Sequence, residues 1–238
     1  MNQAKKINSF FSFFQKKIER IKKLSIPKED IFLKKQFYMA IIDTLGKKIS
    51  LPKTSNRERF VRVVNDFSDW KEKDKVSLPH LCRFMKRITE PKFIKLRTHI
   101  EEKNKLWVHG KTIMLTMDSD FEELTKLWPK EFLKPNNDIS LEHFQHKHLF
   151  YKFRNCLIHE FREPGYGMDF GEESSPFYHS VSGLKSSIIS WELVYPILFL
   201  EEMVESIIEK LRKYFHEIDI DPRICFKFGS NWIEELNN

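Results

Sequence analysis

Glycine is scarce in this chain, and its scarcity limits the available folds more than any other feature of the sequence. Seven of the 238 residues are glycine, and neither a GxGxxG nor a GxxxxGK[ST] pattern occurs. Phosphate-binding loops and dinucleotide folds need glycine at their tight turns. The sequence therefore disfavours those classes and turn-dense β-sandwiches. It favours helices, with 22 phenylalanines to fill the core.

Apolar residues recur at helical spacing in the N-terminal part of the chain. Residues 7–24 form a basic amphipathic pattern, and a second helix is expected to begin near Pro27 and to stop at Gly46. Ser55 or Asn56 is suited to cap a third helix. For residues 7–24 we favour a packing helix over the alternative, a helix that binds a membrane surface or RNA.

The remainder of the chain has longer helical patterns and little evidence for strands. The sequence predicts a short helix opened by Ser77, a small hairpin within 107–115 and a helix over 121–128. A long helix is expected over 140–162, capped by Ser140, and is followed by a loop over 163–188 with a short strand at 177–181. A second long helix is expected over 191–216, interrupted at Pro196. The last twenty residues are expected to pack back as an irregular tail.

These patterns predict a mostly α protein with at most a small β-hairpin. No boundary is sharp enough to split the chain. We therefore predict a single helical domain over 1–238, in which residues 1–70 are accessory N-terminal helices and 140–216 are the core helices.

Charge and cysteine content indicate a partner class and a compartment. The net charge of +7 suits a polyanionic partner, although lysine-rich solvated faces give the same value. Three scattered cysteines form neither a disulfide framework nor a zinc site, so we expect a reducing, cytoplasmic environment. No apolar run reaches the ~18 residues of a membrane span. We expect no membrane partner and no signal peptide.

The stretch from Leu149 to Gly165 has two different faces when it is drawn as a helix. One face is apolar and is expected to pack on the core: Leu149, Phe150, Phe153, Cys156, Leu157 and Phe161. The opposite face mixes aromatic, apolar and ionisable groups and is expected to point outward: His148, Tyr151, Arg154, Asn155, Ile158 and His159.

The outward face carries groups that suit phosphodiester chemistry. Asn155 and His159 are i,i+4 neighbours, so the amide can orient the imidazole. The long arm of Arg154 can cover the roughly 7.5 Å along the axis that separates it from His159. Arginine is an always-charged ligand for phosphate, and an imidazole can exchange a proton near neutral pH. These are the parts needed to cleave RNA without a metal.

The segment Arg154-Asn155-Cys156-Leu157-Ile158-His159 resembles the R-N-x-x-x-H motif of the HEPN domain family. The resemblance implies a helical bundle that forms a homodimer through the motif-bearing face. It also implies an endoribonuclease that needs no metal or other cofactor and leaves a 2′,3′-cyclic phosphate. Arg154, Asn155 and His159 would be the catalytic residues, at a composite site between two copies.

The family resemblance also indicates a biological role and an alternative function. Many members are toxins or effectors in toxin–antitoxin and phage-defence systems, which would add a cognate antitoxin or regulatory protein to the partners. Some members only bind nucleotides or dimerise. The alternative function is therefore a catalytically inactive HEPN-like module for nucleotide or RNA binding, or for protein assembly.

Neighbouring residues have weaker assignments. Tyr151 and His148 are candidate substrate-binding residues, Tyr151 by stacking on a base. Each motif residue also has a structural alternative: a salt bridge from Arg154 to Glu160 or to a C-terminal carboxylate, a helix cap for His159, and a capping or bracing role for Asn155.

Two clusters resemble metal sites but have better explanations. His143 and His146 lack a clear third ligand, so we expect exposed polar residues at a helix start and no metal. The acidic residues between Asp118 and Glu123 are expected to form a solvated helix N-terminus.

The loop 163–188 is a candidate cover for the cleft of the composite site between two copies.

Overall fold

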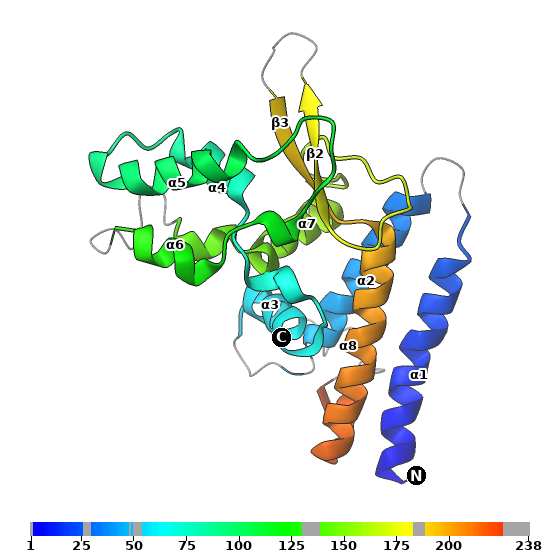
Figure 1. Cartoon of the computed structure of the whole chain (residues 1–238). Helices are drawn as coiled ribbons and strands as arrows, with labels where there is room; N and C mark the ends of the chain where they lie inside the picture. Colours follow the sequence, from blue (N-terminus) through cyan, green and yellow to red (C-terminus); the bar gives the residue numbers. More distant parts are fainter. Residues whose placement is uncertain are drawn as a thin grey trace. The chain divides into compact units, whose positions relative to one another are not determined.

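The computed structural model describes residues 2–25, 30–47, 49, 54–129, 139–182 and 189–225. Its backbone is mostly helical with one small antiparallel sheet, which confirms the mostly α prediction (Figure 1). Contacts between Cα atoms group the chain into two compact units, Met1–Asp69 with Glu201–Asn238, and Trp70–Leu200. The prediction of a single domain stays a prediction, and each unit is described by itself. No helix among the described residues is both long enough and apolar enough to cross a membrane.

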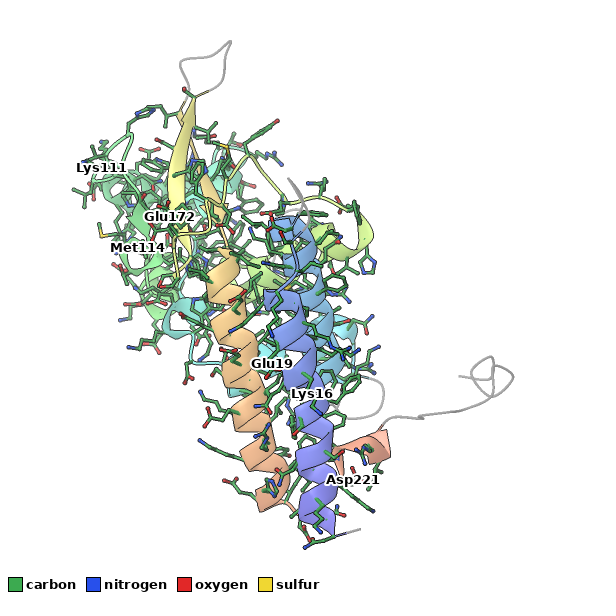
Figure 2. All side chains as sticks on the ribbon, turned by 90° about the vertical axis from the view of Figure 1, so that its right-hand side faces the viewer. Lys16, Glu19, Lys111, Met114, Glu172 and Asp221 are labelled. Carbon is green, nitrogen blue, oxygen red and sulfur yellow. The ribbon has the colours of Figure 1, made fainter. Side chains whose placement is uncertain are left out.

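The unit of Met1–Asp69 and Glu201–Asn238 is helical throughout its described part. Its elements are α1 (Gln3–Lys22), α2 (Asp30–Gly46), α3 (Asn56–Phe67), the residues of α8 (Ile197–Glu217) from Glu201 onward, and a short 3-10 turn, η5 (Pro222–Cys225). Both pictures show α1 beside this part of α8 (Figures 1 and 2). The rings of Phe11 and Phe215 lie 6.0 Å apart between these two helices.

Local sequence signals set the ends of the helices in this unit. Ser55 caps α3 in a capping box, because its hydroxyl accepts from the backbone N–H of Glu58 while the Glu58 carboxylate accepts from the backbone N–H of Ser55. Gly46 ends α2 as predicted, and it lies so close to α3 that a Cβ there would be 2.9 Å from the carbonyl oxygen of Arg59. Pro27 lies outside the described residues.

The described part of the C-terminal tail packs on α1, as expected. Lys6 forms an ion pair with Asp221 at 3.9 Å, and Arg223 donates to the hydroxyl of Ser9. Figure 2 labels Asp221 beside this end of α1. The later tail residues, including Phe226 and Trp232, lie outside the described residues.

The unit of Trp70–Leu200 combines short helices with the sheet. Its helices are α4 (Leu78–Met85), α5 (Ile94–Asn104), α6 (Phe121–Leu127), α7 (His146–His159) and the first turn of α8; its 3-10 turns are η1 (Lys71–Asp74), η2 (Pro91–Phe93), η3 (Leu115–Met117) and η4 (Leu141–Phe144). The strands are β1 (Ile113–Met114), β2 (Phe177–Ser182) and β3 (Ile189–Val194), in the order β1-β2-β3.

An aromatic cluster forms the core of this unit around α7. Phe150 is fully buried, and its ring lies 4.9 Å from that of Tyr195 and 5.6 Å from that of Trp70. The ring of Trp70 in turn lies 5.2 Å from that of Phe199 in the first turn of α8. These edge-to-face pairs add to the stabilisation from burial alone.

Three sequence predictions for this unit are wrong: one in the pairing of a strand, and two in the boundaries of a helix. The hairpin within 107–115 does not form, because β1 pairs with β2 instead, with Ile113 opposite Tyr178. The long helix over 140–162 begins only at His146, since Gln145 has an extended backbone after the 3-10 turn, and it ends at His159. The helix over 191–216 begins at Ile197, because residues 189–194 form a strand.

Candidate functional site

The start of α7 is fixed by a buried carboxylate. One oxygen of Asp118, Oδ2, lies 2.7 Å from Nε2 of His146 and 2.8 Å from the hydroxyl of Tyr178. The other oxygen, Oδ1, accepts from the backbone N–H of Leu78 at the start of α4, at 2.9 Å. Asp118 therefore ties α4, α7 and β2 together through charge-assisted hydrogen bonds.

This network continues from Tyr178 to Ser77 and His80. The Tyr178 hydroxyl lies 2.6 Å from Oγ of Ser77, which lies 2.7 Å from Nδ1 of His80. Each hydroxyl carries one proton. All the contacts are therefore satisfied when His80 Nδ1–H donates to Ser77, Ser77 donates to Tyr178, and Tyr178 donates to Asp118. Burial and the nearby Asp118 carboxylate raise the pKa of Tyr178, so its phenol stays protonated.

Two sequence interpretations are wrong at this network. Asp118 was expected at a solvated helix N-terminus, but it is 3% exposed. His146 was expected among exposed polar residues, but its side chain is fully buried. A buried carboxylate needs hydrogen-bond donors, and His146 and Tyr178 supply them from distant parts of the chain.

The apolar face of α7 packs inward nearly as predicted. Phe150, Phe153, Cys156 and Leu157 are buried. Burial and the nearby Glu160 carboxylate raise the pKa of the Cys156 thiol, in keeping with the expected packing role of this residue. There are two exceptions. Leu149 is partly exposed, and Phe161 is 69% exposed with a φ of 52°, because the helix has ended at His159.

The motif side chains converge at the C-terminal end of α7. One guanidinium nitrogen of Arg154, Nη1, donates to Oδ1 of Asn155 at 3.0 Å and contacts Nε2 of His159 at 2.8 Å. The centre of the same guanidinium lies 6.0 Å from the centre of the Tyr151 ring. Arg154 thus joins three of the four other side chains of the predicted site, those of Tyr151, Asn155 and His159, into one cluster.

The contact with Arg154 determines which ring nitrogen of His159 accepts a hydrogen bond. A guanidinium can only donate, so Nε2 of His159 is the acceptor in this contact, which requires the tautomer with its proton on Nδ1. The prediction that Asn155 orients the imidazole is wrong, because its amide oxygen binds Arg154 instead. Glu160, the alternative partner considered for Arg154, pairs with Arg162.

The exposure of the cluster is uneven. His159 is exposed and Asn155 is partly exposed, whereas Arg154 is 6% exposed. The expectation that Arg154 points outward is therefore wrong: its side chain lies against the protein, and His159 presents the accessible edge. His148 is not part of the cluster. It lies about 16 Å along the helix axis from His159, with its ring 6.5 Å from that of His143.

The segment that follows the motif is held by two carboxylates, the buried one of Glu192 and the partly exposed one of Asp169. Glu192 on β3 accepts from Arg83 at 2.6 Å and from the backbone N–H of Tyr166 at 3.4 Å. Although burial opposes ionisation of Glu192, hydrogen bonds from Ser190 and Arg83 keep its pKa below the ordinary value. Asp169 accepts from the backbone N–H of Ile197 and so caps the start of α8.

This segment, which follows the motif helix in the chain, also exposes large apolar side chains. Tyr166, Met168 and Phe170 are 77%, 57% and 72% exposed. The sequence predicts a loop here as a candidate cover for the cleft, but these exposed apolar side chains were not foreseen. One sequence signal could have revealed these exposed side chains: a cluster of aromatic residues in a segment with no helical period.

A separate cavity of about 260 Å³ flanks α7 on another side. Its charged and polar lining includes His80, Arg83, Lys152 and Glu192, with Gly165 at one edge. Burial and the positive charge of Arg83 lower the pKa of His80 to about 4. None of the motif residues lines this cavity.

In the described part of the chain, no three His, Cys, Asp or Glu side chains are grouped closely enough to hold a metal ion. His143 instead contacts the hydroxyl of Ser140. Comparisons of the chain with protein-family models, with curated proteins and with solved structures find no match. The HEPN resemblance therefore stays a prediction that rests on the motif.

Proposed function

We propose that this protein is a HEPN-like endoribonuclease that cleaves RNA without a metal ion. The observation that carries the proposal is the 2.8 Å contact between Nη1 of Arg154 and Nε2 of His159. The contact brings together the two groups that the chemistry needs: a fixed positive charge, and an imidazole nitrogen that can accept a proton once it leaves the guanidinium.

In the proposed reaction, the 2′-hydroxyl of the RNA attacks the adjacent phosphorus. Nε2 of His159 takes the proton of this hydroxyl as the bond from O2′ to phosphorus forms. The bond from phosphorus to the 5′-oxygen breaks, and the leaving oxygen takes a proton from a second imidazole. The products are a 2′,3′-cyclic phosphate and a 5′-hydroxyl, so no water or metal is consumed in this step.

The second imidazole is proposed to come from a second copy of the chain. One copy offers a single His159, and both a base and an acid are needed. A twofold arrangement of the motif faces would supply both, together with two Arg154 side chains for the phosphoryl oxygens. Asn155 is proposed to hold Arg154 in place. Tyr151 and His148 are proposed to bind the RNA on either side.

The proposal also includes a cellular role and a further protein partner. A cytoplasmic toxin or defence effector that cuts RNA must be restrained, so a cognate antitoxin or regulatory protein is the proposed further partner. The basic net charge of +7 would favour binding to RNA.

The burial of Arg154 favours a second candidate function. An arginine that is 6% exposed and bound to its own neighbours can serve as a structural brace. The protein would then be a catalytically inactive HEPN-like module that binds nucleotides or RNA, or that assembles with other proteins. Catalysis by the first mechanism requires His159 to leave the guanidinium or to share it with the phosphate.

The test is cleavage of a mixed RNA pool by purified protein in EDTA. We expect His159→Ala and Arg154→Lys to abolish cleavage, because arginine's planar fork cannot be replaced by a point charge. His109→Ala is the matched control, since His109 is exposed and lies outside the cluster. Circular dichroism and light scattering check that fold and oligomeric state persist. Cleavage by His159→Ala at the wild-type rate would exclude the mechanism; no cleavage by the wild type would favour the binding module.

A further inference from the structure

An apolar groove runs between α1 and α2, and none of the motif residues lines it. It has a volume of about 410 Å³, and it is lined mainly by aromatic and aliphatic side chains: Phe13, Phe14, Ile21, Leu24, Phe37, Ala40 and Ile41. Phe13 and Phe37 are each 48% exposed, although the opposite face of α1 is buried in the core of its own unit. Contiguous exposed apolar surface of this kind marks interaction sites in soluble proteins.

The charges along the groove are all positive. Lys17 and Arg20 are the charged residues of its lining, and Nζ of Lys17 lies 5.2 Å from the centre of the Phe13 ring. Glu19, labelled on α1 in Figure 2, is the single acidic residue of this helix. It lies about 160° round the helix from Lys17 and is therefore directed away from the groove.

The basic residues of α1 differ in whether they have acidic partners. Lys22 pairs with Glu205 at 2.7 Å, and Lys6 pairs with Asp221 at 3.9 Å. Within the residues that the structure describes, Lys17 and Arg20 take part in no ion pair. Lys5 and Lys16 likewise form no ion pair with any described residue, but Lys17 and Arg20 are the unpaired cations of α1 that line the groove.

We propose that this groove binds an acidic amphipathic helix of a partner protein. The lining of α1 from Phe13 to Ile21 extends over roughly 12 Å, or about two helical turns, and Leu24 continues it beyond the helix end. That length accepts three or four apolar side chains at i, i+3, i+4 and i+7 spacing, as in other helix-in-groove complexes. Asp or Glu on the flanks of the bound helix would meet Lys17 and Arg20.

The shape of the site distinguishes this occupant from a lipid surface. A peripheral membrane site presents protruding apolar groups, whereas here the apolar side chains line a concave groove between two helices. The proposal is independent of the nuclease proposal, because none of the motif residues lies in this unit.

The test uses two labelled synthetic helices and fluorescence anisotropy with the full-length protein. Both peptides carry leucine at i, i+3, i+4 and i+7 spacing; one has glutamate at its flanking positions and the other has lysine. We expect the acidic peptide to bind about tenfold more tightly, since attraction replaces repulsion at two exposed cations. Added salt should reduce the difference.

Charge reversal provides the decisive comparison. In the double variant Lys17→Glu with Arg20→Glu, the lysine peptide should bind more tightly than the glutamate peptide. The matched control reverses Lys5 and Lys16, which are exposed on α1 but do not line the groove, and it should keep the wild-type preference. Circular dichroism verifies that both variants remain folded.

Three outcomes would overturn the proposal. The first is equal affinity of the wild type for both peptides, and the second is an unchanged preference in the groove variant. The third is binding of neither peptide, whether or not the protein cosediments with phosphatidylserine vesicles. Cosedimentation that the groove reversal abolishes would assign the surface to a membrane instead.

Discussion

Acidification should destabilise the unit of Trp70–Leu200 through the imidazole of His80. This ring donates to Ser77 in the network that ends at Asp118, and it lies near the guanidinium of Arg83. Burial and the positive charge of Arg83 lower its pKa from 6.5 to about 4. The folded state therefore binds a proton at His80 less readily than the unfolded state does.

The sign and the size of the effect follow from this difference in pKa. Between pH 6.5 and 4 the unfolded chain holds more protons at His80 than the folded chain, so stability falls as the pH falls through this window. At about pH 5 the expected loss from this residue is about 2 kcal/mol relative to neutral pH. The loss approaches its full value only below the folded pKa.

Urea unfolding of the wild type and of His80→Asn isolates this contribution. The asparagine amide can still donate to Ser77 but does not titrate. The pH-dependent loss should therefore be about 2 kcal/mol smaller in the variant at about pH 5, whereas His109→Asn, an exposed control, should behave as the wild type. Parallel pH profiles for His80→Asn and the wild type would refute the role given to burial and Arg83.

Three substitutions test the packing and the local backbone, each by the free energy of unfolding in urea. Phe150→Ala removes a fully buried ring and should cost about 3–5 kcal/mol; a cost below that of a surface substitution would contradict the aromatic core. Gly165→Ala should cost about 2 kcal/mol, because φ is 76° and the new Cβ would lie 2.5 Å from Oε2 of Glu192, and a stabilised variant would exclude this contact. Ser55→Ala should cost about 1 kcal/mol, and Glu58→Gln, which can keep the capping box, should cost less; equal costs would argue against the box.

The sequence predicted those features that depend on neighbours along the chain. Ser55 and Gly46 marked helix ends because caps and stops act within one turn. The apolar face of α7 followed from its helical period, apart from Leu149, which is partly exposed, and Phe161, which lies beyond the end of the helix. The motif was found for the same reason, since Arg154 and His159 lie on one helix.

Features that depend on pairing between distant residues were missed. Residues 189–194 have an apolar content that fits a helix or a strand, and only their pairing with β2 makes them a strand. Asp118 and His146 look like surface residues in the sequence, because their contact joins positions 28 residues apart. The burial of Arg154 is equally a tertiary effect that helical geometry alone does not reveal.

The most direct test of the central claim is the chemistry of the RNA ends. In the proposed reaction, the imidazole of His159 takes the proton of a 2′-hydroxyl beside the Arg154 guanidinium. The substrate must therefore carry that hydroxyl. The measurement is mass spectrometry of the products from an RNA oligonucleotide and from its 2′-O-methyl counterpart, both incubated with the protein in EDTA. The account predicts cleavage of the RNA alone, with a 2′,3′-cyclic phosphate on the upstream product. Cleavage of the 2′-O-methyl strand, or a 5′-phosphate on the downstream product, would contradict it.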